Sequence, residues 1–171
     1  MTMTEHEQLT FAGVDPGHQS GGIAIVDSLG NVIATTSLMG TKTRPMTDRD
    51  LFDLLVEHSP SLAMLERVHS MPRQGVSSAF KFGASFGTCR TLLTCALVPF
   101  EQPTPGQWQK AMQCLSGGDK RVTRDAAQRM FPDAKVTHAN ADALLLAEHA
   151  RRTYAARRLT GCAVARGSSV R

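Results

Sequence analysis

Three short apolar segments at the start of the chain are separated by turn-rich sequence. Residues 9–15 and 23–26 are predicted strands, and the intervening Asp-Pro-Gly-His-Gln-Ser-Gly-Gly is rich in residues that break strands. A tight turn at residues 28–31 leads into a third predicted strand at residues 32–38. Because short connections join antiparallel strands, the chain is expected to begin as an antiparallel meander.

The rest of the chain is predicted to alternate between helices and strands. In order, the expected elements are a helix capped by Thr47 and ending at Glu57, a strand at 62–66, a helix at 76–96, a strand at 97–100, a short helix carrying Trp108, a helix from Asp119 to just before Pro132, and a helix at 140–154. This order indicates an α/β domain with a mixed five-stranded sheet flanked by helices.

The size of the chain suits one such domain. With 171 residues, 42% of them hydrophobic, it can bury one substantial core, expected at residues 9–158. A polar leader is expected at residues 1–8 and a basic, disordered tail at 159–171. No apolar run is long enough to span a membrane, so a cytoplasmic location without a membrane partner is expected. Four irregularly spaced cysteines suggest reduced packing residues.

Positive charge is concentrated at the C-terminal end. The formal net charge is +4, and every charged residue after Ala150 is an arginine, so a slightly acidic body precedes a basic end. Clustered arginine favours a polyanion such as nucleic acid. A solvated helix face followed by a disordered end would have the same composition.

Three carboxylates occupy positions where an isolated acid would be costly to bury. Asp15 and Glu66 each end an apolar strand, and Asp142 interrupts an apolar helix. If the first and fourth strands are neighbours, Asp15 and Glu66 point into one space that the last helix can reach. Three converging acids call for cations, and two Mg²⁺ ions about 4 Å apart can activate water against a phosphodiester.

Each acid also has an ordinary structural interpretation. Asp15 precedes Pro-Gly and suits the start of a turn. Glu66 could form a surface salt bridge with Arg67 or Arg73. Asp142 could complement the helix macrodipole from the first turn of its helix.

Four segments together resemble the RuvC-like nucleases. Gly-Val-Asp-Pro-Gly at 13–17 with Ser-Gly-Gly-Ile-Ala at 20–24 is similar to their opening motif, and residues 65–78 are similar to their second acidic motif and its loop. Residues 104–110 resemble the segment after the fifth strand, and residues 140–147 the last acidic motif. The likeness runs in order from about Phe11 to Ala150, and the phage-type members are most similar.

The resemblance implies an RNase H-like fold and a Mg²⁺-dependent endodeoxyribonuclease, with Mn²⁺ as an alternative ion. It further implies a homodimer that nicks four-way (Holliday) junctions and other branched DNA, with Asp15, Glu66 and Asp142 as metal ligands. The family commonly has a fourth ligand one helical turn before the last acid, where this chain has Ala139. His138, four residues before Asp142, could replace it as a ligand or as a base.

Several basic and polar residues are candidates for binding DNA. A loop residue such as Arg73 could hold phosphate, and the cluster before the last acid would suit phosphates near the metals. The candidates are Arg73, Gln74, Lys81, Lys110, Lys120, Arg121 and Arg124. A solvated helix face would explain the cluster from Lys120 to Arg124 equally well.

Other functions remain compatible with parts of the pattern. An RNase H-type nuclease acting on RNA–DNA hybrids would use the same metal chemistry. A non-catalytic junction-binding protein is suggested by the missing acid at Ala139. The first glycine-rich turn also resembles a phosphate loop of actin-like ATPases and sugar kinases, but those need two lobes, which one domain of this size cannot provide.

Overall fold

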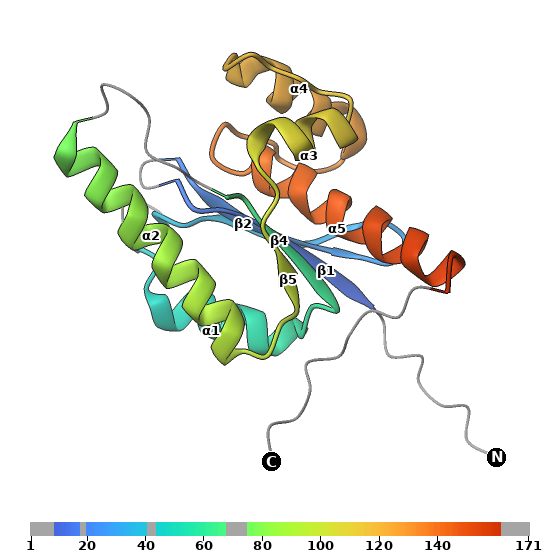
Figure 1. The fold of residues 1–171 in the computed structure, drawn as a ribbon, viewed down its shortest axis with the longest axis horizontal. Helices are drawn as coiled ribbons and strands as arrows, with labels where there is room; N and C mark the ends of the chain where they lie inside the picture. Colours follow the sequence, from blue (N-terminus) through green and yellow to red (C-terminus); the bar gives the residue numbers. More distant parts are fainter. Residues whose placement is uncertain (1–8, 18–19, 41–43, 68–74, 162–171) are drawn as a thin grey trace.

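The computed structural model describes residues 9–17, 20–40, 44–67 and 75–161. Its centre is a five-stranded sheet with helices on both faces (Figure 1). The strands, in the spatial order β3-β2-β1-β4-β5, are β3 (Val32–Ser37), β2 (Gly22–Asp27), β1 (Thr10–Asp15), β4 (Leu62–Leu65) and β5 (Phe100–Glu101). Strands β1, β2 and β3 pair antiparallel, whereas β4 lies parallel to both β1 and β5. The predicted mixed five-stranded sheet is therefore confirmed.

Two helical layers cover the sheet. Helices α1 (Asp48–His58) and α2 (Val76–Cys95) pack on one face, and α3 (Pro105–Ala111), α4 (Lys120–Met130) and α5 (Ala141–Leu159) lie on the other. Alternate strand residues divide between the two cores, because successive side chains of a strand point to opposite faces. In β1, Phe11 faces α5, while Ala12 and Val14 face α1 and α2.

Two element boundaries differ from the sequence-based prediction by more than one residue. The strand expected at 97–100 begins only at Phe100, because Leu97 has a left-handed backbone (φ 57°) and the Val98 N–H donates to Leu93 O, which closes the end of α2. Helix α5 continues past residue 154 to Leu159, and Arg157 in its last turn forms an ion pair with Glu101 of β5.

The predicted leader at 1–8 lies outside the described residues, as do residues 162–171 of the predicted tail. Cys89, Cys95 and Cys114 are free thiols, and Cys95 is exposed. In the described part of the chain, no helix has the length and apolar character needed to cross a membrane.

Candidate active site

Asp15 and Glu66 lie at the ends of two neighbouring parallel strands. Val14 of β1 pairs with Leu65 of β4, and the Glu66 N–H donates to Val14 O at 2.9 Å, which extends this pairing by one residue. Side chains alternate along a strand, so Asp15 lies on the same face of β1 as Phe11 and Gly13, which face α5. By the same alternation Glu66 lies on the same face as Leu62 and Met64 of β4. Both acids are therefore directed towards the same helix-covered face.

Asp142 approaches this edge from the first turn of α5. The helix can lie on β1 because Gly13 has no side chain: a Cβ there would be 2.0 Å from Ala143 O and 2.2 Å from Ala147 N. Gly22 of β2 lies equally close to the segment before α5, since a Cβ on it would be 2.3 Å from Ala139 O. Two glycines thus allow α5 to bring Asp142 to the end of β1.

The turn after β1 is held by Asp15 itself. Its Oδ1 accepts a hydrogen bond of 3.0 Å from the Gly17 N–H, and the Gly21 N–H donates to Gly17 O at 2.9 Å. A Cβ on Gly21 would be 2.3 Å from Gly17 O, so this turn excludes a side chain there. The turn role of Asp15 and its place beside Glu66 are therefore compatible.

The three carboxylates interact electrostatically. Burial, followed by the negative charges of Glu66 and Asp142, raises the pKa of Asp15 from 3.8 to about 7. Burial also raises the pKa of Glu66, with a further contribution from Asp142, against the opposing effects of a hydrogen bond from Trp108 and the charge of Lys120. Oδ1 of Asp142 is buried and has no hydrogen-bond partner in the described structure.

These features fit a divalent cation, although the side chains do not form a closed ligand set. Among the described residues, no three His, Cys, Asp or Glu side chains are arranged to hold one ion. Like charges repel one another, and a cation shared between the carboxylates would offset that repulsion. The partnerless Oδ1 of Asp142 and the raised pKa of Asp15 are the features that a bound cation would relieve.

Sequence reasoning did not identify the role of Trp108. Its side chain is fully buried, and its indole nitrogen donates a hydrogen bond of 2.8 Å to Oε1 of Glu66. The capping box formed by Thr104 and Gln107 sets the start of α3 and therefore the position of Trp108. The Thr-Pro-Gly-Gln pattern predicts the helix, but nothing local to it indicates a partner 42 residues away.

Among the described candidate DNA-binding residues, Lys120 is the one whose charge acts on the acids. Its Nζ donates to Ser20 Oγ at 3.0 Å, and its charge lowers the pKa of both Asp15 and Glu66. Lys81 and Lys110 are exposed, and neither forms an ion pair within the described residues.

The other candidates are either paired or not described. Arg121 pairs with Asp119 at 2.9 Å, and Arg124 pairs with Asp125 at 3.1 Å. These acids partly neutralise the cluster that the sequence suggested. Arg73 and Gln74 lie outside the described residues.

The side chain of His138 lies beside Arg124 of α4. It is exposed, and its Nε2 lies 3.4 Å from Nη1 of Arg124. It is not among the main groups that shift the pKa of Asp15 or Glu66. Asn140 orders this segment, because its Oδ1 accepts from the Thr137 N–H at 2.7 Å.

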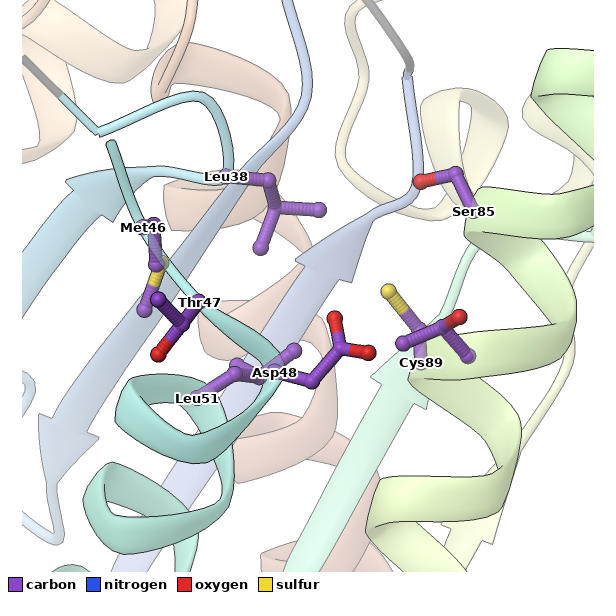
Figure 2. A pocket seen from close by; sticks show the side chains of 8 residues that line it. Leu38, Met46, Thr47, Asp48, Leu51, Ser85 and Cys89 are labelled. Atoms are coloured by element: carbon purple, nitrogen blue, oxygen red, sulfur yellow. The ribbon is translucent and has the colours of Figure 1, made fainter.

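A separate pocket of about 110 Å³ opens on the other face of the sheet, between α1 and α2 (Figure 2). Figure 2 shows side chains of Leu38, Asp48, Ser85 and Cys89 around it. Burial, with the nearby charges of Asp15 and Asp48, raises the pKa of the Cys89 thiol to about 12. The thiol therefore stays protonated at neutral pH and is a poor nucleophile.

The arginines of α5 are less available to a polyanion than the sequence suggested. Glu148 accepts hydrogen bonds of 2.7 Å from both Arg151 and Arg152, and Arg157 pairs with Glu101. The pairs with Glu148 link neighbouring turns of α5, and the pair with Glu101 links α5 to β5. Part of the basic C-terminal region therefore stabilises the domain.

No model of a known protein family matches the sequence, and no curated protein matches it. Several solved structures share its fold, among them two of RuvC. A structure described as Thermus thermophilus RuvC in complex with Holliday junction substrate is 20% identical with a TM-score of 0.66, and the match covers 90% of this chain and 97% of that one. A second T. thermophilus RuvC structure is 18% identical with a TM-score of 0.65, covering 89% and 98%. The chain therefore has the RNase H-like fold seen in RuvC.

Proposed function

We propose that this protein is a structure-selective endonuclease that cleaves four-way DNA junctions and other branched DNA in the presence of divalent cations. The observation that carries the proposal is the placement of Asp15 and Glu66 at neighbouring strand ends, with Asp142 on the helix packed against β1. The negative charge of Asp142 raises the pKa of both Asp15 and Glu66. The shared fold of a RuvC bound to a Holliday junction supports the choice of substrate. The likeness to phage-type members rests on the motifs alone, since the two structures described above are both T. thermophilus RuvC.

In this proposal Asp15, Glu66 and Asp142 hold Mg²⁺, or Mn²⁺ in its place, with two ions per site. Bound ions would supply a water activated for attack and charge stabilisation for the leaving oxygen of the phosphodiester. The protein's own contribution is to hold three oxygen donors together and to orient them. Lys120, beside Ser20, would contact a DNA phosphate next to the acids.

His138 is proposed as a fourth ligand or as a base acting on the attacking water. It lies four residues before Asp142, but its exposed side chain would have to turn from Arg124 towards the acids. His138→Asn then lowers the cleavage rate and leaves junction binding intact. An unchanged rate would remove His138 from the site and leave the three carboxylates.

A homodimer is also proposed, with two opposed strands nicked by two sites. The outer face of α2 supports it, since Gly83 and Gly87 have open space where a Cβ would lie and Phe80 is 76% exposed. Small residues of this kind allow close approach of a second helix. Sedimentation of the full chain would report the oligomeric state, and a monomer at concentrations that support paired nicking would contradict the dimer.

The decisive experiment compares three labelled substrates: a four-way junction, a linear duplex and an RNA–DNA hybrid, each with Mg²⁺, Mn²⁺ or EDTA. Metal-dependent nicking of the junction alone is expected. Asp15→Asn and Glu66→Gln should lower the rate on the order of 1000-fold while junction binding persists. Cleavage of the hybrid would favour an RNase H-type nuclease, and binding without nicking would favour a non-catalytic junction-binding protein.

A further inference from the structure

We infer that Trp108 is a positioning residue whose indole N–H holds the Glu66 carboxylate in the orientation that binds divalent cations. The inference rests on the proposed function, because it assigns Glu66 a cation. It starts from one contact: Nε1 of Trp108 lies 2.8 Å from Oε1 of Glu66.

The indole nitrogen depends on this bond. An indole has one N–H and accepts no hydrogen bond, and the Trp108 side chain is 0% exposed, so water does not replace a lost partner. A buried donor without a partner costs about 1–3 kcal/mol. The bond to an ionised carboxylate is also stronger than one between neutral groups. Trp108 therefore constrains Glu66 as long as the core is intact.

The backbone on both sides of the contact is held in register. The N–H of Arg67, next to Glu66, donates to Pro103 O at 2.9 Å, and Thr104 then begins the capping box of α3. The two chain segments that carry donor and acceptor are therefore bonded to each other as well. These backbone bonds hold the Trp108 indole and the Glu66 carboxylate at a constant distance from each other.

The consequence for Glu66 is a carboxylate with one oxygen engaged. Side-chain rotation that would break the bond is opposed, and Oε2 is left to other partners at the edge shared with Asp15 and Asp142. Groups that orient a metal ligand in this way typically contribute 10- to 100-fold to metal affinity, on the order of what we expect here. The alternative is that Trp108 only fills the core between the sheet and α5.

Trp108→Phe separates these roles, because it keeps an aromatic ring in the core and removes the N–H. Mn²⁺ binding to the full chain would be measured by calorimetry, with folding checked by circular dichroism. We expect affinity to fall about 10- to 100-fold. Phe131→Leu is the matched control, since Phe131 is buried in the same core, and it should lose stability with unchanged Mn²⁺ affinity.

Trp108 is the single tryptophan of the chain, so its fluorescence gives a second measurement on the unaltered protein. Mg²⁺, which does not quench fluorescence itself, should change the emission of the parent and leave that of Glu66→Gln unchanged. Equal Mn²⁺ affinity in parent and Trp108→Phe would overturn the inference alone. If Trp108→Phe does not fold, an unchanged tryptophan emission of the parent on Mg²⁺ binding would overturn the inference. A parent that binds neither ion would overturn the proposed metal centre as well.

Discussion

Gly13 of β1 lies directly against the backbone of Ala143 in α5, so closely that a Cβ on Gly13 would be 2.0 Å from the Ala143 carbonyl oxygen. Real Cβ atoms do not approach backbone this closely. The glycine therefore sets the distance between the strand that carries Asp15 and the helix that carries Asp142.

Gly13→Ala should destabilise the protein by about 2–3 kcal/mol, because the helix must move away from the sheet to accommodate the methyl group. Urea unfolding monitored by circular dichroism measures this. Gly106→Ala is the matched control: Gly106 lies in α3 and a methyl group there would meet no atom within 4 Å, so alanine should be neutral or stabilise slightly. Equal stabilities of the two variants would contradict the close packing of α5.

The raised pKa of Asp15 predicts how stability without metal depends on pH. The folded protein keeps a proton on Asp15 up to about pH 7, whereas the unfolded chain releases it near 3.8. Between these values the folded state binds more protons, so stability falls as pH rises and levels off above about 7. With EDTA present, Asp15→Asn should remove much of this loss, on the order of 2–4 kcal/mol at pH 8.

Urea unfolding between pH 4 and 8 would test this, with Asp133→Asn as the control at an exposed acid. Parallel pH profiles for the parent and Asp15→Asn would show that Asp15 is not under electrostatic strain. Mg²⁺ should restore stability at pH 8 in the parent and not in Asp15→Asn.

Glu148 predicts a second, opposite pH dependence. Burial alone would raise the pKa of Glu148, but hydrogen bonds from Arg151 and Arg152 outweigh it and hold the pKa below 4.5. This stabilisation is present above pH 4.5 and is lost as pH falls through the lowered pKa of the folded state. Glu148→Gln should cost about 2–4 kcal/mol at pH 7, because it leaves the arginines without a counter-charge.

Asp53→Asn is the control for Glu148→Gln. It breaks the exposed pair between Arg49 and Asp53, whose side chains are 79% and 52% exposed, and should cost less than about 1 kcal/mol. Thermal unfolding at pH 7 would compare the stability lost in Glu148→Gln with that lost in Asp53→Asn. A Glu148→Gln protein as stable as Asp53→Asn would mean that the α5 arginines do not support the domain.

Lys120→Ala should lower junction cleavage at least about tenfold and reduce the slope of log affinity against log salt by about one. The reason is that Lys120 combines closeness to Asp15 and Glu66 with an amine that forms no ion pair in the described residues. Arg121→Ala removes a neighbouring charge already paired with Asp119, and should have a smaller effect. Binding and nicking assays across a salt series give both quantities.

Much of the fold could be predicted from local sequence patterns. The first four strands fall within one residue of their expected limits, because apolar runs and turn residues act over a few neighbouring positions. The exception is the strand expected at 97–100, where apolar residues close the end of α2 instead. The apolar character of this segment did not predict the left-handed backbone at Leu97 or the 88% exposure of its side chain, although the neighbouring Val98 is buried.

The candidate site, like the fold, was predicted only in part from the sequence. The sequence by itself determined that Asp15, Glu66 and Asp142 stand in apolar segments, and alternation along β1 and β4 determined the face of the sheet on which the first two lie. Only the tertiary structure decided their partners: Trp108 for Glu66, and the backbone contact at Gly13 that admits α5. Periodicity sets the direction of a side chain, whereas the atom it meets depends on how two distant elements pack, and that distance is a property of the whole core.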